Sequence, residues 1–132
     1  MKKIAVTGAG GYIGTSLVPM LLSRGYHVTA MDRFFFGKEF LKQHPNLKVL
    51  QLDSRLIEEH HFNEIDAVID LVAISNDPSG EYFQEVTVQI NCDARIKTAQ
   101  LAKKAGVKRY ILPSSCSIYG FQEDGVIADE RS

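Results

Sequence analysis

The sequence predicts an α/β fold in which a doubly wound parallel sheet of about five strands is covered by helices on both faces. Short, nearly continuous apolar segments alternate with longer amphipathic ones, which is typical of strands buried on both sides. A glycine-rich turn directly follows the first apolar segment. The length of 132 residues and the absence of any linker rich in Pro, Gly or Ser indicate a single domain spanning 1–132.

The first elements are a strand at 3–7 and a helix at 12–24. Within this helix, Ile13, Leu17 and Leu21 recur every four residues and are expected to face the core. The remaining strands are short segments rich in Val, Ile or Leu, expected at 27–32, 47–53, 67–73 and 110–114.

A long helix is expected at 81–105, before the last of these strands. Its apolar stripe consists of Val88, Cys92, Ile96 and Ala99, and Gly106 ends it. The residues after the fifth strand form a polar tail in which no further helix is visible. Because a doubly wound sheet usually continues beyond its fifth strand, we expect an incomplete domain, truncated before the sixth strand and lacking a carboxyl-terminal substrate domain.

Composition excludes several classes of function. A net charge of -1 gives no basic excess for nucleic acid. The longest apolar segment, 67–74, falls well short of the roughly 20 residues that a membrane-spanning helix needs. Cys92 and Cys116 lack the spacing of a metal site, and no signal peptide precedes them, so the sequence predicts a cytoplasmic protein. The adjacent pair His60-His61 lacks further ligands, and no metal is expected.

The turn Thr7-Gly8-Ala9-Gly10-Gly11-Tyr12-Ile13-Gly14 joins the first strand to the first helix. Gly8 permits the tight turn, Gly11 lets the backbone approach a pyrophosphate, and Gly14 lets the helix pack closely against the strand. The helix N-terminus offers free N–H groups to the same pyrophosphate. This context predicts a Rossmann-type dinucleotide-binding site.

Asp32 ends the second strand, 18 residues after Gly14. A carboxylate at this place accepts hydrogen bonds from the adenosine ribose and repels a 2′-phosphate, which favours NAD over NADP. The neighbouring Arg33 is the type of residue that holds such a phosphate, and Asp32 alone is also compatible with a strand-end cap. For Phe34-Phe35-Phe36 we leave open whether they cover the adenine, contact another subunit or anchor the loop.

These residues resemble the extended short-chain dehydrogenases/reductases, and within them the NAD-dependent epimerase/dehydratase family that includes UDP-glucose 4-epimerase. The family's turn is Thr-Gly-x-x-Gly-x-x-Gly, often with Tyr-Ile before the last glycine, and residues 7–14 match it throughout. The resemblance covers nearly the whole chain. It implies that NAD is the cofactor.

Further segments match this family in order along the chain. The resemblance implies that Asp53 contacts the adenine amino group, that residues 71–73 line the cofactor through their backbone, and that Asn91 holds the backbone behind the site. Asp70 stands where the family has histidine. The full predicted cofactor-binding set is Gly8, Gly11, Tyr12, Ile13, Gly14, Asp32, Arg33, Asp53, Ser54, Leu71, Val72, Ala73, Asn91 and Ser114.

The segment Ser114-Ser115-Cys116-Ser117-Ile118-Tyr119-Gly120 is similar to the end of the family's fifth strand and places Ser115 at the catalytic-serine position. The family's Tyr-x-x-x-Lys pair is missing, because the residue four beyond Tyr119 is Glu123. The resemblance therefore implies the amino-terminal part of a longer enzyme, inactive by itself.

The function implied is hydride transfer at a hydroxyl of a nucleotide sugar by an NAD-dependent epimerase or dehydratase, a homodimer at full length. Two alternatives remain open. One is a non-catalytic dinucleotide-binding or sensing module, and the other is an NAD(P)-dependent carbonyl reductase. A Tyr-x-x-x-Lys pair in the complete gene separates an enzyme from a sensing module.

Overall fold

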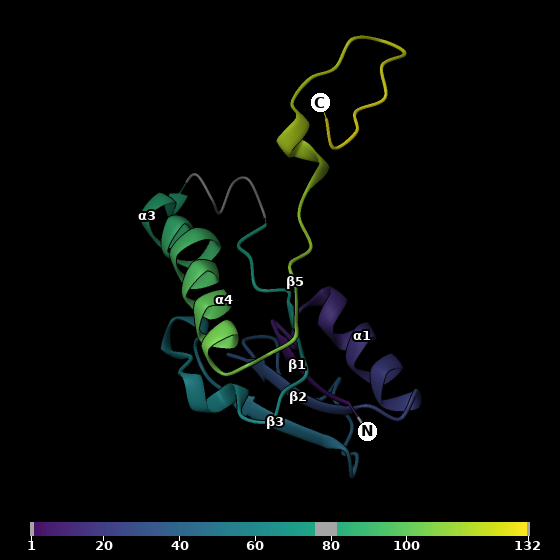
Figure 1. Ribbon diagram of the computed structural model, residues 1–132, viewed down its shortest axis with the longest axis vertical. Coiled ribbons are helices and arrows are strands. Elements are labelled where there is room, and N and C mark those ends of the chain that lie inside the picture. Colours follow the sequence, from purple (N-terminus) through teal and green to yellow (C-terminus); the bar gives the residue numbers. More distant parts are fainter. Residues whose placement is uncertain (1, 76–81, 132) are drawn as a thin grey trace.

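A computed structural model describes residues 2–75 and 82–131 and contains a five-stranded, fully parallel sheet in the order β3-β2-β1-β4-β5 (Figure 1). The strands are β1 Lys3–Thr7, β2 His27–Asp32, β3 Leu47–Gln51, β4 Ala67–Asp70 and β5 Arg109–Ile111. The chain runs outward from β1 to β3 and then returns to place β4 on the other side of β1. This reversal is the topological switch point at which doubly wound sheets bind ligands, and the predicted fold class is confirmed.

Helices cover both faces of the sheet (Figure 1). Helix α1 Tyr12–Ser23 packs on one face, where Val18 joins a buried cluster with Ile4 and Val6. The other face is covered by α3 Gln84–Val88, a π-helix Gln89–Asp93 and α4 Ala94–Lys104. The short 3-10 turns are η1 Ser54–Leu56, η2 Glu59–Phe62 and η4 Cys116–Tyr119. Each face therefore has its own apolar core.

The predicted core-facing stripe of the first helix is wrong for Ile13, whereas Leu21 packs against the core as predicted. The buried positions of α1 are Gly14, Val18 and Leu22, whereas Ile13 is 59% exposed. The cause is Gly14, at which a Cβ would lie 2.5 Å from the Gly8 carbonyl oxygen. Only the face of α1 that carries this glycine can approach the strand so closely, and the residues four and eight positions later follow it inward.

The long helix predicted at 81–105 is interrupted, and its apolar stripe is also wrong. Residue 81 lies outside the described residues, and the π-helix at Gln89–Asp93 separates α3 from α4. Because a π-helix closes its hydrogen bonds five residues apart, it rotates the following helix face. Ile96 is consequently exposed, and the buried positions of α4 are Ala94, Arg95, Thr98 and Ala102. Val88, which precedes the π-helix, is also exposed.

Three strands end earlier than predicted, because the residues that follow turn into loops. Leu52 donates its N–H to the carbonyl of Asp32, and Leu71 donates to the carbonyl of Thr7, so each of these two loops begins with a backbone hydrogen bond to the neighbouring strand. After β5 the chain leaves the sheet as an extended arm (Figure 1). Within the described residues, no helix has the length and apolar character needed to cross a bilayer.

Candidate functional site

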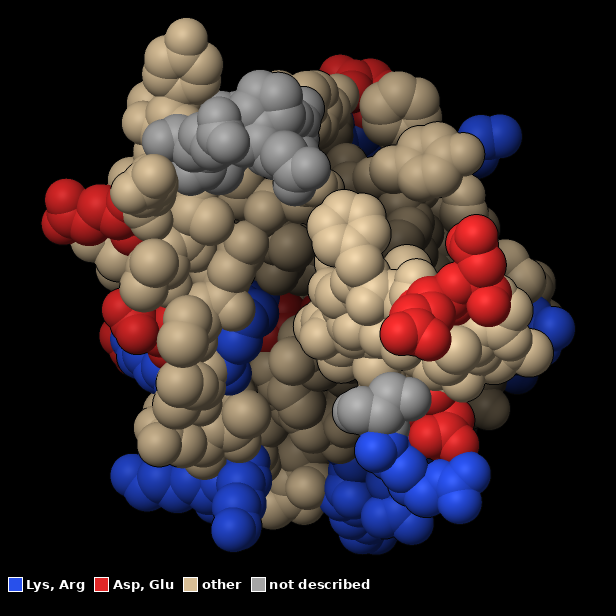
Figure 2. Space-filling model, turned by 90° about the horizontal axis from the view of Figure 1, so that it is seen from above, with Lys and Arg blue, Asp and Glu red and all other residues tan. Residues whose placement is uncertain are grey.

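A pocket of about 240 Å³ lies at the carboxyl ends of the parallel strands. The surface on the side of the C-terminal arm is hollowed between two masses of largely uncharged side chains (Figure 2). Residues from the glycine turn, the ends of β2, β3 and β4, and the π-helix line the pocket: Thr7, Gly8, Gly10, Gly11, Met31, Asp32, Arg33, Phe35, Phe36, Leu52, Asp53, Ser54, Ile57, Leu71, Val72, Ala73, Ile74 and Ile90.

Gly8 and Gly11 shape the turn in different ways. Gly8 has φ +71°, and a Cβ there would lie 2.8 Å from the carbonyl carbon of Leu71. A Cβ at Gly11 would meet nothing nearer than the Gly8 carbonyl oxygen at 3.3 Å, so this position leaves the pocket floor open. The turn therefore forms a shallow cradle of backbone whose upper side carries no side chain.

The N-terminus of α1 opens beside this cradle. Its N-cap, Gly11, makes no side-chain capping hydrogen bond, and the first turn contains no acidic residue. The N–H groups of Tyr12, Ile13 and Gly14 therefore lack intrahelical acceptors and carry the positive end of the helix dipole. The Tyr12 side chain is 95% exposed, so the predicted contribution of this residue would come from its backbone.

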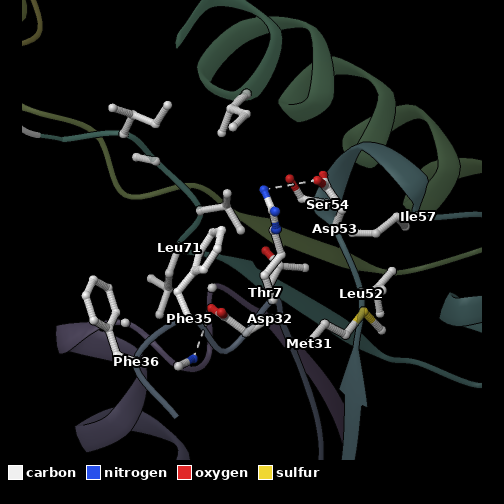
Figure 3. A pocket seen from close by; sticks show the side chains of 18 residues that line it. Thr7, Met31, Asp32, Phe35, Phe36, Leu52, Asp53, Ser54, Ile57 and Leu71 are labelled. Carbon is white, nitrogen blue, oxygen red and sulfur yellow. Dashed lines mark hydrogen bonds and ion pairs between the residues drawn. The ribbon is translucent and has the colours of Figure 1, made fainter. Parts of the chain in front are cut away.

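Asp32 reaches the pocket from the end of β2 and is held by backbone N–H groups. Gly10 donates to Asp32 Oδ2 at 3.1 Å and Phe34 donates to Oδ1 at 2.6 Å. A Cβ at Gly10 would lie 3.1 Å from Cγ of Asp32 and 2.8 Å from the Phe34 ring, so this glycine makes room for the carboxylate. Figure 3 shows Asp32 between Phe36 on one side and Asp53 on the other.

Asp53, just beyond β3, carries a dense set of donors. Arg55 contacts both carboxylate oxygens, with its Nη2 2.7 Å from Oδ2 and its Nε 3.0 Å from Oδ1. The backbone N–H of Arg55 also donates to Oδ1 at 2.9 Å, and Arg33 Nη1 lies 3.4 Å from Oδ2. Because a carboxylate accepts about four hydrogen bonds, contact with an adenine amino group would displace one of these donors and stays a prediction.

The stability that Asp53 contributes is expected to depend on pH. The hydrogen bond from the Arg55 side chain outweighs desolvation and lowers the pKa of Asp53 from 3.8 to about 2. A carboxyl whose pKa is depressed by folding stabilises the folded state above its unfolded pKa, and this contribution disappears as the pH falls from 3.8 toward 2. The free energy of unfolding, measured as the pH falls through this range, should decrease less steeply for Asp53→Asn than for the original chain. Equal slopes would contradict this role of Asp53.

A buried charge network lies beneath the pocket, at the end of β4. Asp70 is 1% exposed and forms an ion pair with Arg95 of α4, while Thr7 donates to its Oδ1 at 2.5 Å. Tyr110 of β5 donates its hydroxyl to Oδ2, and burial and Asp70 raise the pKa of Tyr110, which keeps it a proton donor. The network joins the last residue of β1 to β4, β5 and α4, and so fixes the base of the glycine turn.

Asn91 holds the loop after β4. Its Oδ1 accepts from the Ile74 N–H at 2.8 Å and its Nδ2 donates to the Ile74 carbonyl at 2.9 Å. Arg95 Nε donates to the Ile90 carbonyl, five residues earlier, and so supports the π-helix that carries Asn91. Asn91 therefore acts on residues that line the pocket without lining it itself.

Ser114 and Ser115 lie outside the pocket, at the start of the arm. Both are exposed, and Ser115 caps η4 by accepting from the Ser117 N–H at 3.2 Å. Among the described residues, no group of three or more His, Cys, Asp or Glu side chains is arranged to hold a metal ion.

The pocket brings together most of the predicted cofactor-binding residues: Gly8, Gly11, Asp32, Arg33, Asp53, Ser54, Leu71, Val72 and Ala73. The predicted set did not include Thr7, Gly10, Met31, Leu52, Ile57, Ile74 and Ile90. Phe35 and Phe36, whose role was left open, also line the pocket. Gly10 occupies a variable position of the family's turn. Its place between Gly8 and Gly11 was nevertheless a signal that could have found it. The apolar residues gave no local signal, because only the folding of distant loops brings them to the pocket.

Comparison with known proteins places the chain among relatives of similar fold. The NAD dependent epimerase/dehydratase family matches residues 4–132. UDP-glucuronic acid decarboxylase 1 of Danio rerio is 29% identical over 126 residues, which cover 92% of this chain and 29% of that protein. The chain thus spans less than a third of the length of this curated relative.

Two solved structures extend this comparison. UDP-N-acetylglucosamine 4-epimerase from Methanobrevibacter ruminantium M1, in complex with UDP-N-acetylmuramic acid, is 28% identical with a TM-score of 0.89, covering 98% of this chain and 43% of that one. The Bordetella bronchiseptica enzyme WbmH, in complex with NAD+, is 32% identical with a TM-score of 0.76, covering 92% of this chain and 41% of that one. The family match over residues 4–132 agrees with the sheet order and the glycine turn. The chain therefore belongs to the NAD-dependent epimerase/dehydratase family.

Proposed function

We propose that this chain binds NAD in the pocket at the carboxyl ends of its strands and is the cofactor-binding portion of an enzyme that acts on nucleotide sugars. The observation that carries the proposal is the coupling of Asp32 to the glycine turn through Gly10 N. This contact supports the proposal, because a strand-end carboxylate beside a glycine turn suits the ribose and the pyrophosphate of a dinucleotide.

The residues present fit the pyrophosphate and the adenosine of such a cofactor. Gly11 leaves space above the turn, and the free N–H groups of α1 suit the negative charge of a pyrophosphate. Asp32 suits the hydroxyl groups of an adenosine ribose, because each of its oxygens retains acceptor capacity beside the backbone N–H that it already binds. Asp53 and Ser54 would border the adenine, and residues 71–73 would line the cofactor through their backbone.

The reaction proposed is hydride exchange at a sugar hydroxyl, for which NAD supplies the hydride acceptor when bound. Ser115 would hydrogen-bond the substrate oxygen that loses or gains a proton, and Ser114 would lie beside the cofactor. The UDP-sugar names of the relatives support a nucleotide-sugar substrate. Activity should be sought in the complete gene product with UDP-sugars, and absence of a Tyr-x-x-x-Lys pair there would contradict the enzymatic part of the proposal.

Two further properties belong to this proposal. A homodimer is supported by apolar side chains exposed on α3 and around it, where Phe83 is 61% exposed and Val88 is 55% exposed. A cytoplasmic location is supported by Cys92 and Cys116, which are both exposed and unpaired.

Cofactor preference tests the adenosine end of the site. NAD is expected to raise the melting temperature of the chain more than NADP at equal concentration, because Asp32 repels a 2′-phosphate. Asp32→Ala should abolish or reverse this difference. Glu64→Gln, which removes a carboxylate that pairs with Lys3 on the surface, should leave it unchanged. Equal protection of the original chain by both cofactors would count against the role of Asp32.

A further inference from the structure

Arg33 follows Asp32 directly, and an arginine at this place is the usual partner of the 2′-phosphate of NADP. In this structure its guanidinium is already engaged. Nη1 lies 3.4 Å from Asp53 Oδ2, and Cζ lies 4.2 Å from the centroid of the Phe35 ring. The side chain therefore extends sideways, from the end of β2 toward the end of β3, and forms part of the pocket wall.

The backbone holds Arg33 in this direction. Its carbonyl accepts from Gln51 Nε2 at 3.2 Å, which ties it to the end of β3. The next residue, Phe34, is buried with φ +54°, a conformation that a bulky side chain rarely adopts. The hydrogen bond from Phe34 N to Asp32 maintains this turn, which brings the Phe35 ring against the guanidinium of Arg33.

The charges around Arg33 are balanced. Asp53 pairs with both Arg33 and Arg55, and Asp32 lines the same pocket, so these four groups together carry no net charge to attract a phosphate dianion. The Asp53 side chain is only 15% exposed, and poor solvation strengthens its attraction for the nearby guanidinium groups. A 2′-phosphate could recruit Arg33 only by separating it from Asp53 and by approaching two carboxylates.

We propose that Asp53 is a specificity-determining residue that makes this chain prefer NAD, by holding the Arg33 guanidinium against Phe35 and away from the adenosine 2′ position. Asp32 repels the phosphate directly, whereas Asp53 removes the group that would otherwise bind it. This inference rests on the proposed binding of NAD in the pocket.

The test compares the original chain with Asp53→Asn by isothermal titration calorimetry, using NAD and NADP. Asparagine keeps the size of the side chain and removes the charge that restrains Arg33. The ratio of the NADP to the NAD dissociation constant is expected to fall about two- to fivefold, as for loss of one charge pair whose arginine is half-exposed. Adenosine 2′,5′-bisphosphate against 5′-AMP should show the same change, because the effect lies at the adenosine end.

Two further variants identify the group responsible. In Asp53→Asn/Arg33→Gln, the ratio should return to the original value, because Arg33 is the group released. If the gain for NADP persisted without Arg33, Arg55 would be the phosphate partner and the proposal would be overturned. Glu64→Gln, which removes a carboxylate at the amino ends of β1 and β4, should leave the ratio unchanged.

The outcomes separate this inference from the function on which it rests. Failure of the original chain to bind NAD would reject the proposed function, whereas normal NAD binding with an unchanged ratio in Asp53→Asn would reject only the role of Asp53. Circular dichroism checks the fold of each variant. If Asp53→Asn does not fold, Asp53→Ser takes its place. It also removes the charge that holds Arg33 and should lower the ratio in the same direction, and an unchanged ratio overturns the proposal.

Discussion

Replacement of Asp70 by asparagine is expected to lower the free energy of unfolding by about 3–5 kcal/mol, a large part of the stability of a small domain. Arg95 is 5% exposed and its Nη2 has no hydrogen-bond partner among the described residues, so Asp70 is its essential counter-charge. Asparagine would also present an amide donor where Thr7 and Tyr110 donate. Urea unfolding followed by circular dichroism measures the effect.

Two further variants test this explanation. Asp70→Asn/Arg95→Met removes both charges and should recover part of the lost stability, because an apolar side chain tolerates burial. Glu64→Gln removes the exposed pair with Lys3 and should change the free energy of unfolding by less than about 1 kcal/mol. If Asp70→Asn were as mild as Glu64→Gln, the buried network would not hold the base of the glycine turn.

Gly14→Ala is expected to destabilise the chain by about 2–3 kcal/mol, through overpacking between α1 and the turn. The new Cβ would lie 2.5 Å from the Gly8 carbonyl oxygen and 2.6 Å from that of Ala9, and neither backbone atom can move without shifting the turn. Thermal unfolding in the absence of cofactor measures this effect.

Gly11→Ala is the matched control for Gly14→Ala. Its Cβ would lie 3.3 Å from the nearest heavy atom, so the free energy of unfolding should fall by less than about 1 kcal/mol. The same methyl group would occupy the cradle of the turn, so NAD affinity should fall although the fold persists. A Gly14→Ala chain as stable as Gly11→Ala would refute the close packing on which the orientation of α1 depends.

The elements that the sequence predicts well are those fixed by local pattern. The first two strands have the predicted bounds. The glycine turn directly follows the first, and Gly25 and Asp32 mark the two ends of the second. Asp32, Gly8 and Gly11 meet in one pocket because parallel strands bring their carboxyl ends to one edge of the sheet.

The elements that the sequence did not predict depend on contacts between distant residues. The π-helix is supported by Arg95, whose side chain bonds the Ile90 carbonyl and whose burial requires Asp70, 25 residues earlier. No helical period reveals such a pair. The inward face of α1 follows from one backbone contact at Gly14, which outweighs the apolar character of Ile13. Likewise, the engagement of Arg33 by Asp53 joins the ends of two strands.

Amide chemical-shift mapping of the chain during titration with NAD tests the central claim most directly, because it reports which residues meet the cofactor. We expect saturable shifts at Gly8, Gly10 and Gly11 for the pyrophosphate and at Asp32 and Asp53 for the adenosine. Residues on the distant surface at 43–47 should not move. Shifts confined to that surface, or no shifts at millimolar NAD, would contradict the assignment of this pocket as the cofactor site.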